Sequence, residues 1–106
     1  MDDCIFCNIV NGKIPGKFVF QDRDFIVIND INPKAPVHML VIPKKHVADF
    51  INSDNVLLNK LLALLKKLIS RQHVKSYRLV TNGDGAAVID HFHVHLMGRV
   101  AKDRDL

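Results

Sequence analysis

Histidine and apolar residues alternate strictly between positions 91 and 96. His91, His93 and His95 occupy every second position, and the residues between them are apolar. A period of two is typical of a β-strand with one buried face, so we expect the three imidazoles to share the opposite face. Imidazole titrates near neutral pH, and a row of three could supply a nucleophile, a proton donor and an orienting group. A zinc site is the alternative interpretation, because alternating histidines also bind zinc.

The rest of the pattern predicts further strands and two helices. Short apolar runs bounded by turn residues predict strands over 18–21, 25–29, 38–42 and 77–81. Two prolines in 30–36 make this segment an ordered loop. Leucines at three- and four-residue steps predict a long amphipathic helix over 53–73, with Ser53 as its N-cap. Asp3 is placed to cap a short helix near the N-terminus.

These elements together predict an α+β fold. We expect a mostly antiparallel five-stranded sheet with one long and one short helix. The chain has 106 residues, so a single domain over 1–106 is expected. A domain of this size gains stability from association with a second copy, and the apolar face of the long helix is wide enough to reach a partner subunit.

Charge and hydropathy narrow the classes of partner. The net charge of +4 favours anionic small molecules or nucleic acid. Lysine and arginine are spread along the chain without a basic run among aromatics, so stable nucleic-acid binding is not expected. The longest apolar run, 61–65, is too short for a bilayer, and the start Met1-Asp2-Asp3 lacks the features of a signal peptide. We therefore expect no membrane partner and a cytoplasmic location.

The two cysteines form a Cys-x-x-Cys pair. Cys4 and Cys7 are three residues apart and would share a face of the short helix. In the cytoplasm they are expected to be reduced thiols or metal ligands rather than a disulfide. Their spacing suits two thiolates on one tetrahedral zinc, and structural thiols are the alternative.

Several linked motifs resemble one known family. The segment 91–97 resembles the His-φ-His-φ-His-φ-φ signature of the histidine-triad (HIT) superfamily, where φ is an apolar residue. Three more segments are similar to its Hint branch: Asp-Ile-Asn-Pro-Lys-Ala-Pro-Val-His at 30–38, Val-Ile-Pro-Lys-Lys-His at 41–46, and Cys-Ile-Phe-Cys at 4–7 with Ile-Pro at 14–15. The similarity runs from Cys4 to Arg99 in the family's order, so it implies a HIT-like fold over nearly the whole chain.

The resemblance implies a nucleotidyl hydrolase or transferase acting at an α-phosphate. Purine nucleoside phosphoramidates or related nucleotides would be cleaved through a nucleotidyl-histidine intermediate on His93, with no cofactor required for the chemistry. His95 would contact the phosphate or assist the leaving group. His91 and His38 would lie behind His93 in a hydrogen-bonded relay. A dinucleoside polyphosphate hydrolase and a nucleotide-binding module with little turnover are the alternatives.

The resemblance also implies residues that bind the substrate. Asn82 would contact the phosphate and Asp30 the ribose hydroxyls, although both are also common turn residues. Phe6, Ile9 and Ile31 would line the base pocket, where simple core packing is the alternative.

A metal site and a dimer are implied as well. Some bacterial relatives with the N-terminal cysteine pair bind structural zinc with two further histidines, which correspond here to His46 and His91. Zinc on His91 conflicts with a place in the proton relay. Hint-like relatives form homodimers through the long helix and the adjoining strand, so a homodimer is expected.

Two departures from the family pattern bear on substrate. The turn before the triad reads Gly-Ala-Ala-Val-Ile-Asp at 85–90, with Ala87 where the family usually has glutamine. The tail 100–106 lacks the family's Trp-Pro ending. We therefore expect weak activity or an altered substrate.

Overall fold

The computed structural model describes residues 3–105, so residues 1, 2 and 106 of the predicted domain lie outside the described part. Seven elements follow one another along the chain: α1 (Ile5–Val10), β1 (Phe18–Gln21), β2 (Phe25–Asn29), β3 (Val37–Pro43), α2 (Asn55–Arg71), β4 (Arg78–Val80) and β5 (Val94–Gly98). The strands form one antiparallel sheet in the order β1-β2-β3-β5-β4. This confirms the predicted α+β fold with a five-stranded antiparallel sheet, a long helix and a short one.

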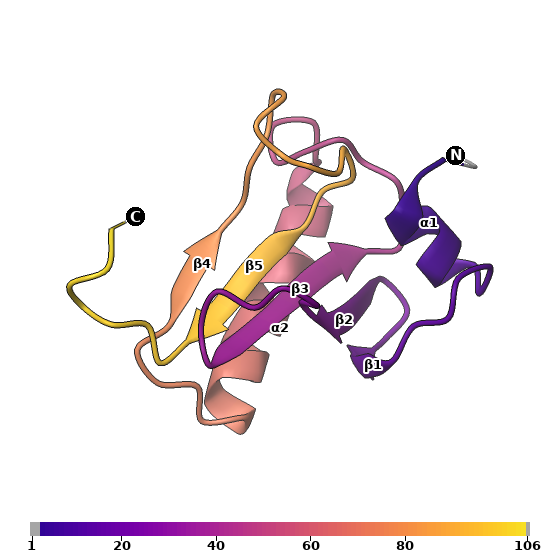
Figure 1. Ribbon diagram of the computed structural model, residues 1–106. Helices are drawn as coiled ribbons and strands as arrows, with labels where there is room; N and C mark the ends of the chain where they lie inside the picture. Colours follow the sequence, from indigo (N-terminus) through magenta and orange to yellow (C-terminus); the bar gives the residue numbers. More distant parts are fainter. Residues whose placement is uncertain (1–2, 106) are drawn as a thin grey trace.

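Helix α2 covers one face of the sheet and carries the chain from β3 to β4 (Figure 1). Its buried residues Leu61, Leu65 and Leu68 pack against the sheet. Each leucine buried in this way contributes about 1.5–3 kcal/mol to folding. The leucine stripe is therefore mainly core packing. Within residues 3–105, no helix combines the length and apolar character needed to cross a membrane.

The opposite face of the sheet, here called the front face, is covered by α1 over only part of its area (Figure 1). Phe6 of α1 packs with Ile26, Leu40 and Ile42 in a second, smaller cluster. Met39 and Val41 belong to the cluster against α2, so β3 alternates between the two faces. No helix of the described chain covers the rest of the front face, and side chains of β3 and β5 form its surface.

The histidine strand is shorter than predicted. β5 begins at Val94, so His91 and His93 precede it, whereas the sequence predicted all three histidines within one strand. Phe92 N–H donates to the carbonyl of Val47 (2.6 Å), which lies outside the strands. The alternation itself persists, because Phe92 joins the cluster against α2.

Both helices begin one residue later than predicted. Cys4, not Asp3, caps α1, because its Sγ accepts from Cys7 N–H at 3.4 Å. Asp54 caps α2 by accepting from Leu57 N–H at 2.8 Å. The hydroxyl of Ser53, the predicted cap, donates instead to the main chain of Asp49. Asp54 is the N-cap in place of Ser53 because its carboxylate is the stronger acceptor at the positive end of the helix.

Asp49 fastens the loop that follows β4 to the segment before α2. Its buried carboxylate accepts from Asp84 N–H (3.0 Å) and from the side-chain amide of Asn52 (2.6 Å). Hydrogen bonds from Asp84 and Asn52 to the anion lower the pKa of this carboxyl group. A Cβ at Gly83 would lie 3.0 Å from Asp49 Cβ, so the loop needs glycine at this close approach.

We expect Asp49→Asn to lower the melting temperature by about 4–8 °C. An amide nitrogen cannot accept, so the substitution leaves at least one of the donors around position 49 unpaired. Circular dichroism at neutral pH measures the shift. Asp103→Asn, at an exposed position, is the matched control and is expected to melt like the wild type. Equal melting of all three proteins would contradict a fastening role for Asp49.

Candidate active site

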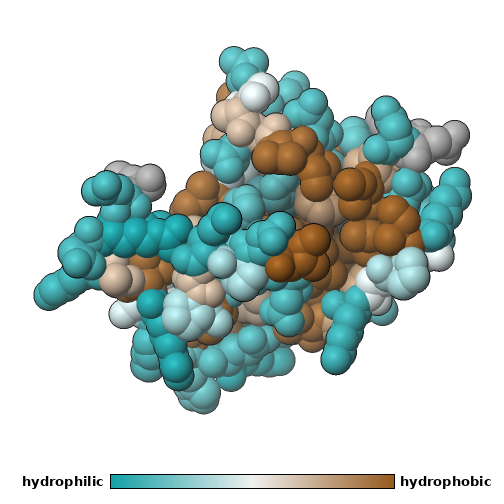
Figure 2. Space-filling model, viewed as in Figure 1, coloured by the Kyte–Doolittle hydropathy of each residue, from teal (hydrophilic) through white to brown (hydrophobic). Residues whose placement is uncertain are grey.

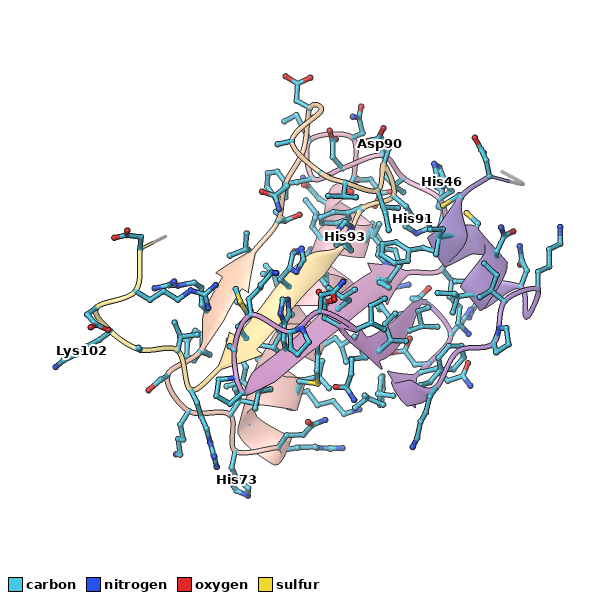
Figure 3. All side chains as sticks on the ribbon, viewed as in Figure 1. His46, His73, Asp90, His91, His93 and Lys102 are labelled. Carbon is cyan, nitrogen blue, oxygen red and sulfur yellow. The ribbon has the colours of Figure 1, made fainter. Side chains whose placement is uncertain are left out.

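The three triad histidines come from one continuous segment that leads into β5, and His38 joins them from β3. Figure 3 shows His91 and His93 on the part of this segment that precedes β5. His91 is fully buried, His93 is 8% exposed and His38 is 6% exposed. In the register of β3 with β5, Leu40 lies opposite His95 and His38 lies opposite Met97. His38 and His95 are therefore diagonal neighbours on the same face of the sheet.

The tautomer of His93 is set by the main chain. Its Nδ1 lies 2.7 Å from the carbonyl oxygen of His91, which can only accept, so Nδ1 carries the proton. In residues 3–105, Nε2 of His93 has no protein hydrogen-bond partner and is not sealed from solvent. The Thr81 hydroxyl donates to the carbonyl of His93 at 2.8 Å and steadies the segment. His93 thus presents the lone pair of Nε2.

A second chain of hydrogen bonds sets the tautomer of His95. Lys34 N–H donates to His38 Nδ1 at 2.9 Å, so the proton of that ring is on Nε2. His38 Nε2 lies 2.9 Å from His95 Nδ1, which must therefore accept. The proton of neutral His95 is then on its Nε2. Asp30 stands 3.3 Å from His38 Nε2 and orients the same ring.

This geometry corrects the predicted relay. The sequence interpretation placed the rings of His91 and His38 behind His93, but the His38 ring bonds to His95 and the His91 ring faces the cysteines. The register explains the difference, since His93 precedes β5 and the diagonal neighbour of His38 is His95. What His93 receives from His91 is a main-chain carbonyl.

Burial keeps His38 and His95 neutral near pH 7. Removal from water lowers the pKa of both rings, because the charged form loses hydration. For His38, Asp30 raises the pKa against this effect, while Arg104 and Lys34 lower it further. A neutral His38 is also what its hydrogen bonds require, since Nδ1 accepts from Lys34.

We expect stability to fall as the pH is lowered through about 6.5. A histidine with a lowered pKa in the folded state binds fewer protons than in the unfolded chain, so its contribution is complete above the unfolded pKa and declines below it. Melting temperatures at about pH 7.5 and pH 5.5 measure this loss in the wild type and in His38→Asn. The loss is expected to be smaller in His38→Asn than in the wild type, and His73→Asn, at an exposed position, is the control for replacing a histidine by asparagine. An undiminished loss in His38→Asn would contradict the role of this ring.

A cavity of about 620 Å³ opens on the front face beside His93 and His95. One end of it is apolar and lies next to α1, and the other end is polar. Figure 2 shows hydrophobic residues gathered around α1 and the loop after β4, and hydrophilic ones over β4 and the C-terminal tail. This space, the front cavity, is lined by every residue predicted to bind substrate: Phe6, Ile9, Asp30, Ile31 and Asn82.

The four predicted metal ligands also come together. One nitrogen or sulfur atom of each of Cys4, Cys7, His46 and His91 lies within 4.8 Å of the others. His46 Nδ1 is 3.2 Å from Cys7 Sγ, and His91 Nδ1 is 3.4 Å from Cys4 Sγ. Figure 3 shows His46 and His91 close together beside α1. The other nitrogen of His91 donates to the Pro43 carbonyl at 2.8 Å, as ligating histidines commonly do. Two sulfurs and two nitrogens at this spacing fit tetrahedral zinc.

Comparison with known proteins decides the family. A family model described as "Scavenger mRNA decapping enzyme C-term binding" matches residues 3–104. A HIT-like protein of Methanocaldococcus jannaschii is 34% identical over 108 residues, covering 97% of this chain and 84% of its own. A solved HIT family hydrolase from Clostridium thermocellum is 32% identical, covers 100% of this chain and 98% of its own, and superposes with a TM-score of 0.88. The chain belongs to the HIT superfamily.

Two further proteins are similar to a comparable degree. A HIT family hydrolase from Legionella pneumophila is 38% identical, with 93% of this chain and 95% of the other covered and a TM-score of 0.84. Protein pkiA of Dictyostelium discoideum is 39% identical over 105 residues, covering 91% of this chain and 83% of its own.

This HIT protein has an apolar loop between β4 and its triad. Ala86, Val88 and Ile89 of that loop line the front cavity, where the family pattern led us to expect a glutamine near Ala87. Asp49 and Thr81 hold the loop and the triad segment, and sequence reasoning identified neither of them. Their only sequence signal is a polar side chain, at the end of a predicted strand for Thr81 and in a loop segment for Asp49, and this does not distinguish a positioning residue from a solvated one.

Proposed function

We propose that this HIT protein is a nucleotidyl hydrolase that cleaves purine nucleoside phosphoramidates, or related nucleotides, at the α-phosphate. The free Nε2 lone pair of His93 at the wall of the front cavity carries the proposal. Neutral imidazole is a competent nucleophile near pH 7. The solved relatives named HIT family hydrolases from Clostridium thermocellum and Legionella pneumophila support hydrolysis.

The reaction has two steps. Nε2 of His93 attacks the α-phosphorus and forms a P–N bond, while the bond from phosphorus to the leaving amine breaks. The His91 carbonyl stabilises the imidazolium that forms, because it accepts from Nδ1. His95 donates a hydrogen bond from Nε2–H to the departing amine, and the amine takes its proton from solvent. Water then attacks phosphorus and loses a proton to solvent, the P–N bond to His93 breaks, and the nucleoside monophosphate is released.

The remaining residues bind the rest of the nucleotide. Asp30 would accept from the ribose hydroxyls, and Asn82 would donate to a phosphoryl oxygen. Phe6, Ile9 and Ile31 would enclose the base at the apolar end of the front cavity. All of these groups belong to the chain itself, so the proposed chemistry requires no cofactor.

A quenched-turnover mass spectrum tests the proposal. Protein mixed with adenosine phosphoramidate and quenched in acetonitrile at neutral pH, where a P–N bond survives, is expected to gain the mass of one adenylyl group. Turnover of a diadenosine polyphosphate in preference to the phosphoramidate would move the assignment to polyphosphate hydrolysis. Tight binding of adenosine monophosphate without adduct or turnover would favour a binding module, which the apolar loop at 85–90 motivates.

We also propose a structural zinc held by Cys4, Cys7, His46 and His91. The four ligands would fill its coordination sphere and fix α1 to the sheet. The His91 ring is then a ligand, and the conflict with a relay through that ring disappears. His93 would remain free to act as the nucleophile.

A homodimer is proposed through α2 and β4. Leu62 on α2 is 57% exposed, and Leu79 on β4 is 42% exposed although it pairs with fully buried Leu96. β4 has only three residues and lies at the edge of the described sheet, where a second copy could pair with it.

We expect the wild type to sediment as a dimer at micromolar concentration and Leu79→Lys to sediment as a monomer. A lysine at this position would place a charge in an apolar interface. Ile51→Lys is the control, because Ile51 is 80% exposed in the turn before α2. A monomeric wild type would remove the dimer from the proposal.

A further inference from the structure

A second cavity of about 260 Å³ adjoins the front cavity and lies toward β4 and the C-terminal tail. The two cavities share Asp30, Lys34, Asn82 and His95, so a ligand at the imidazoles can extend from one into the other. We call the second space the cationic cavity, because Lys34, Arg78 and Arg104 all line it.

The two arginines are held by main-chain oxygens rather than by carboxylates. Arg78 donates to the carbonyls of Asp105 (3.1 Å) and Arg104 (3.5 Å), and Arg104 donates to the carbonyl of Lys34 (2.5 Å). Within residues 3–105, neither arginine nor Lys34 forms a salt bridge. Carbonyls position a guanidinium group without neutralising it, so its charge remains available to a ligand.

The acidic residues at the cationic cavity do not balance these charges. Its carboxylates are those of Asp30 and Asp105, against three cations. Asp30 is already engaged, because one oxygen accepts from Asn32 N–H at 2.8 Å and the other faces His38. With His38 and His95 neutral, a net positive charge remains at the end of the site away from α1.

The two cavities therefore lie in one row across the front face. The apolar end next to α1 suits a base, the imidazoles of His93 and His95 suit the α-phosphate, and the cationic cavity follows beyond His95. The group that leaves from phosphorus would enter this last space. We propose that the leaving group of the natural substrate carries an anionic substituent, a carboxylate or a phosphate, which the cationic cavity binds. This inference rests on the proposed function.

A matched pair of substrates tests the inference. Adenosine phosphoramidates of one amino acid, with either a free carboxylate or its carboxamide, differ only in charge at the leaving group. At low salt we expect kcat/KM to favour the carboxylate about fivefold, the size of a partly exposed ion pair, and the preference to fall as salt is raised. Arg78→Gln and Arg104→Gln are each expected to reduce the preference, because kcat/KM for the carboxylate falls more than kcat/KM for the carboxamide. Arg23→Gln is the control, because it removes one positive charge on the turn between β1 and β2. This variant should keep the preference for the carboxylate substrate.

Two results would overturn the inference while leaving the proposed function intact. These are equal rates for the two substrates in the wild type, and an equal fall for both substrates in the arginine variants. Cleavage of neither substrate would refute the proposed function. In that case, calorimetry measures the binding of adenosine monophosphate and adenosine diphosphate, which tests the cationic cavity without turnover. The additional phosphate of the diphosphate is the anionic group in this test. Tighter binding of the diphosphate, lost in Arg78→Gln, would support the cationic cavity, and equal binding would overturn it.

Discussion

His93→Asn is expected to lower kcat/KM for adenosine phosphoramidate by at least about 10³-fold and to abolish the nucleotidyl adduct. The asparagine amide can still donate to the carbonyl of His91, so the local main chain keeps its hydrogen bond. What disappears is the Nε2 lone pair. Rates measured with the substrate below its KM, together with quenched mass spectra, give both readouts.

His73→Asn is the matched control for this experiment. His73 is exposed and lies far from the triad (Figure 3). Its φ of 51° is in the left-handed region, which asparagine tolerates. This variant should retain wild-type rates and the adduct. Unchanged turnover in His93→Asn would refute His93 as the nucleophile.

Removal of zinc is expected to lower the melting temperature by roughly 15–30 °C. A metal that binds only the folded state stabilises it by about 4 kcal/mol when its free concentration is a thousandfold above Kd. For a domain of this size, each kcal/mol corresponds to several degrees. The measurement compares melting with and without a strong chelator, on protein purified without a histidine tag and assayed for metal.

Variants separate this zinc from adventitious metal. His46→Asn removes one ligand of the cluster and should bind less than one zinc per chain, while His73→Asn should bind one. The chelator should then have little further effect on His46→Asn. A wild type with much less than one zinc per chain, and with unchanged melting in chelator, would refute the site.

The sequence predicted the faces of the elements better than their pairings. The alternation at 91–96 correctly separates Phe92, Val94 and Leu96, which pack toward α2, from the histidines. It did not reveal that the strand starts only at Val94, because that depends on Phe92 bonding to distant Val47. Strand ends are set by partners far away in sequence, and no local pattern contains this information.

The hydrogen-bond partner of the His38 ring could not be predicted from the sequence for a related reason. Only the register of β3 against β5 decides whether its ring meets His93 or His95, and a shift of two residues would exchange them without changing which face is buried. The cationic cavity could not be predicted from the sequence either. Lys34, Arg78 and Arg104 come from three separate segments and carry no shared motif. The cysteine pair was easier, since its spacing along the chain already suits a metal.

His91 contributes to two sites through two different groups. Its ring lies beside the cysteine thiols, and its main-chain carbonyl accepts a hydrogen bond from His93. Every amino acid has that carbonyl. A lineage that lost Cys4 and Cys7 would therefore be free to discard the imidazole at 91 and still inherit a correctly oriented nucleophile, provided that the backbone kept its course. Proline at 92 would be purged by selection, because it would remove the N–H that Val47 accepts. The orientation of the nucleophile thus depends on the path of this segment and not on the side chain of the first triad histidine.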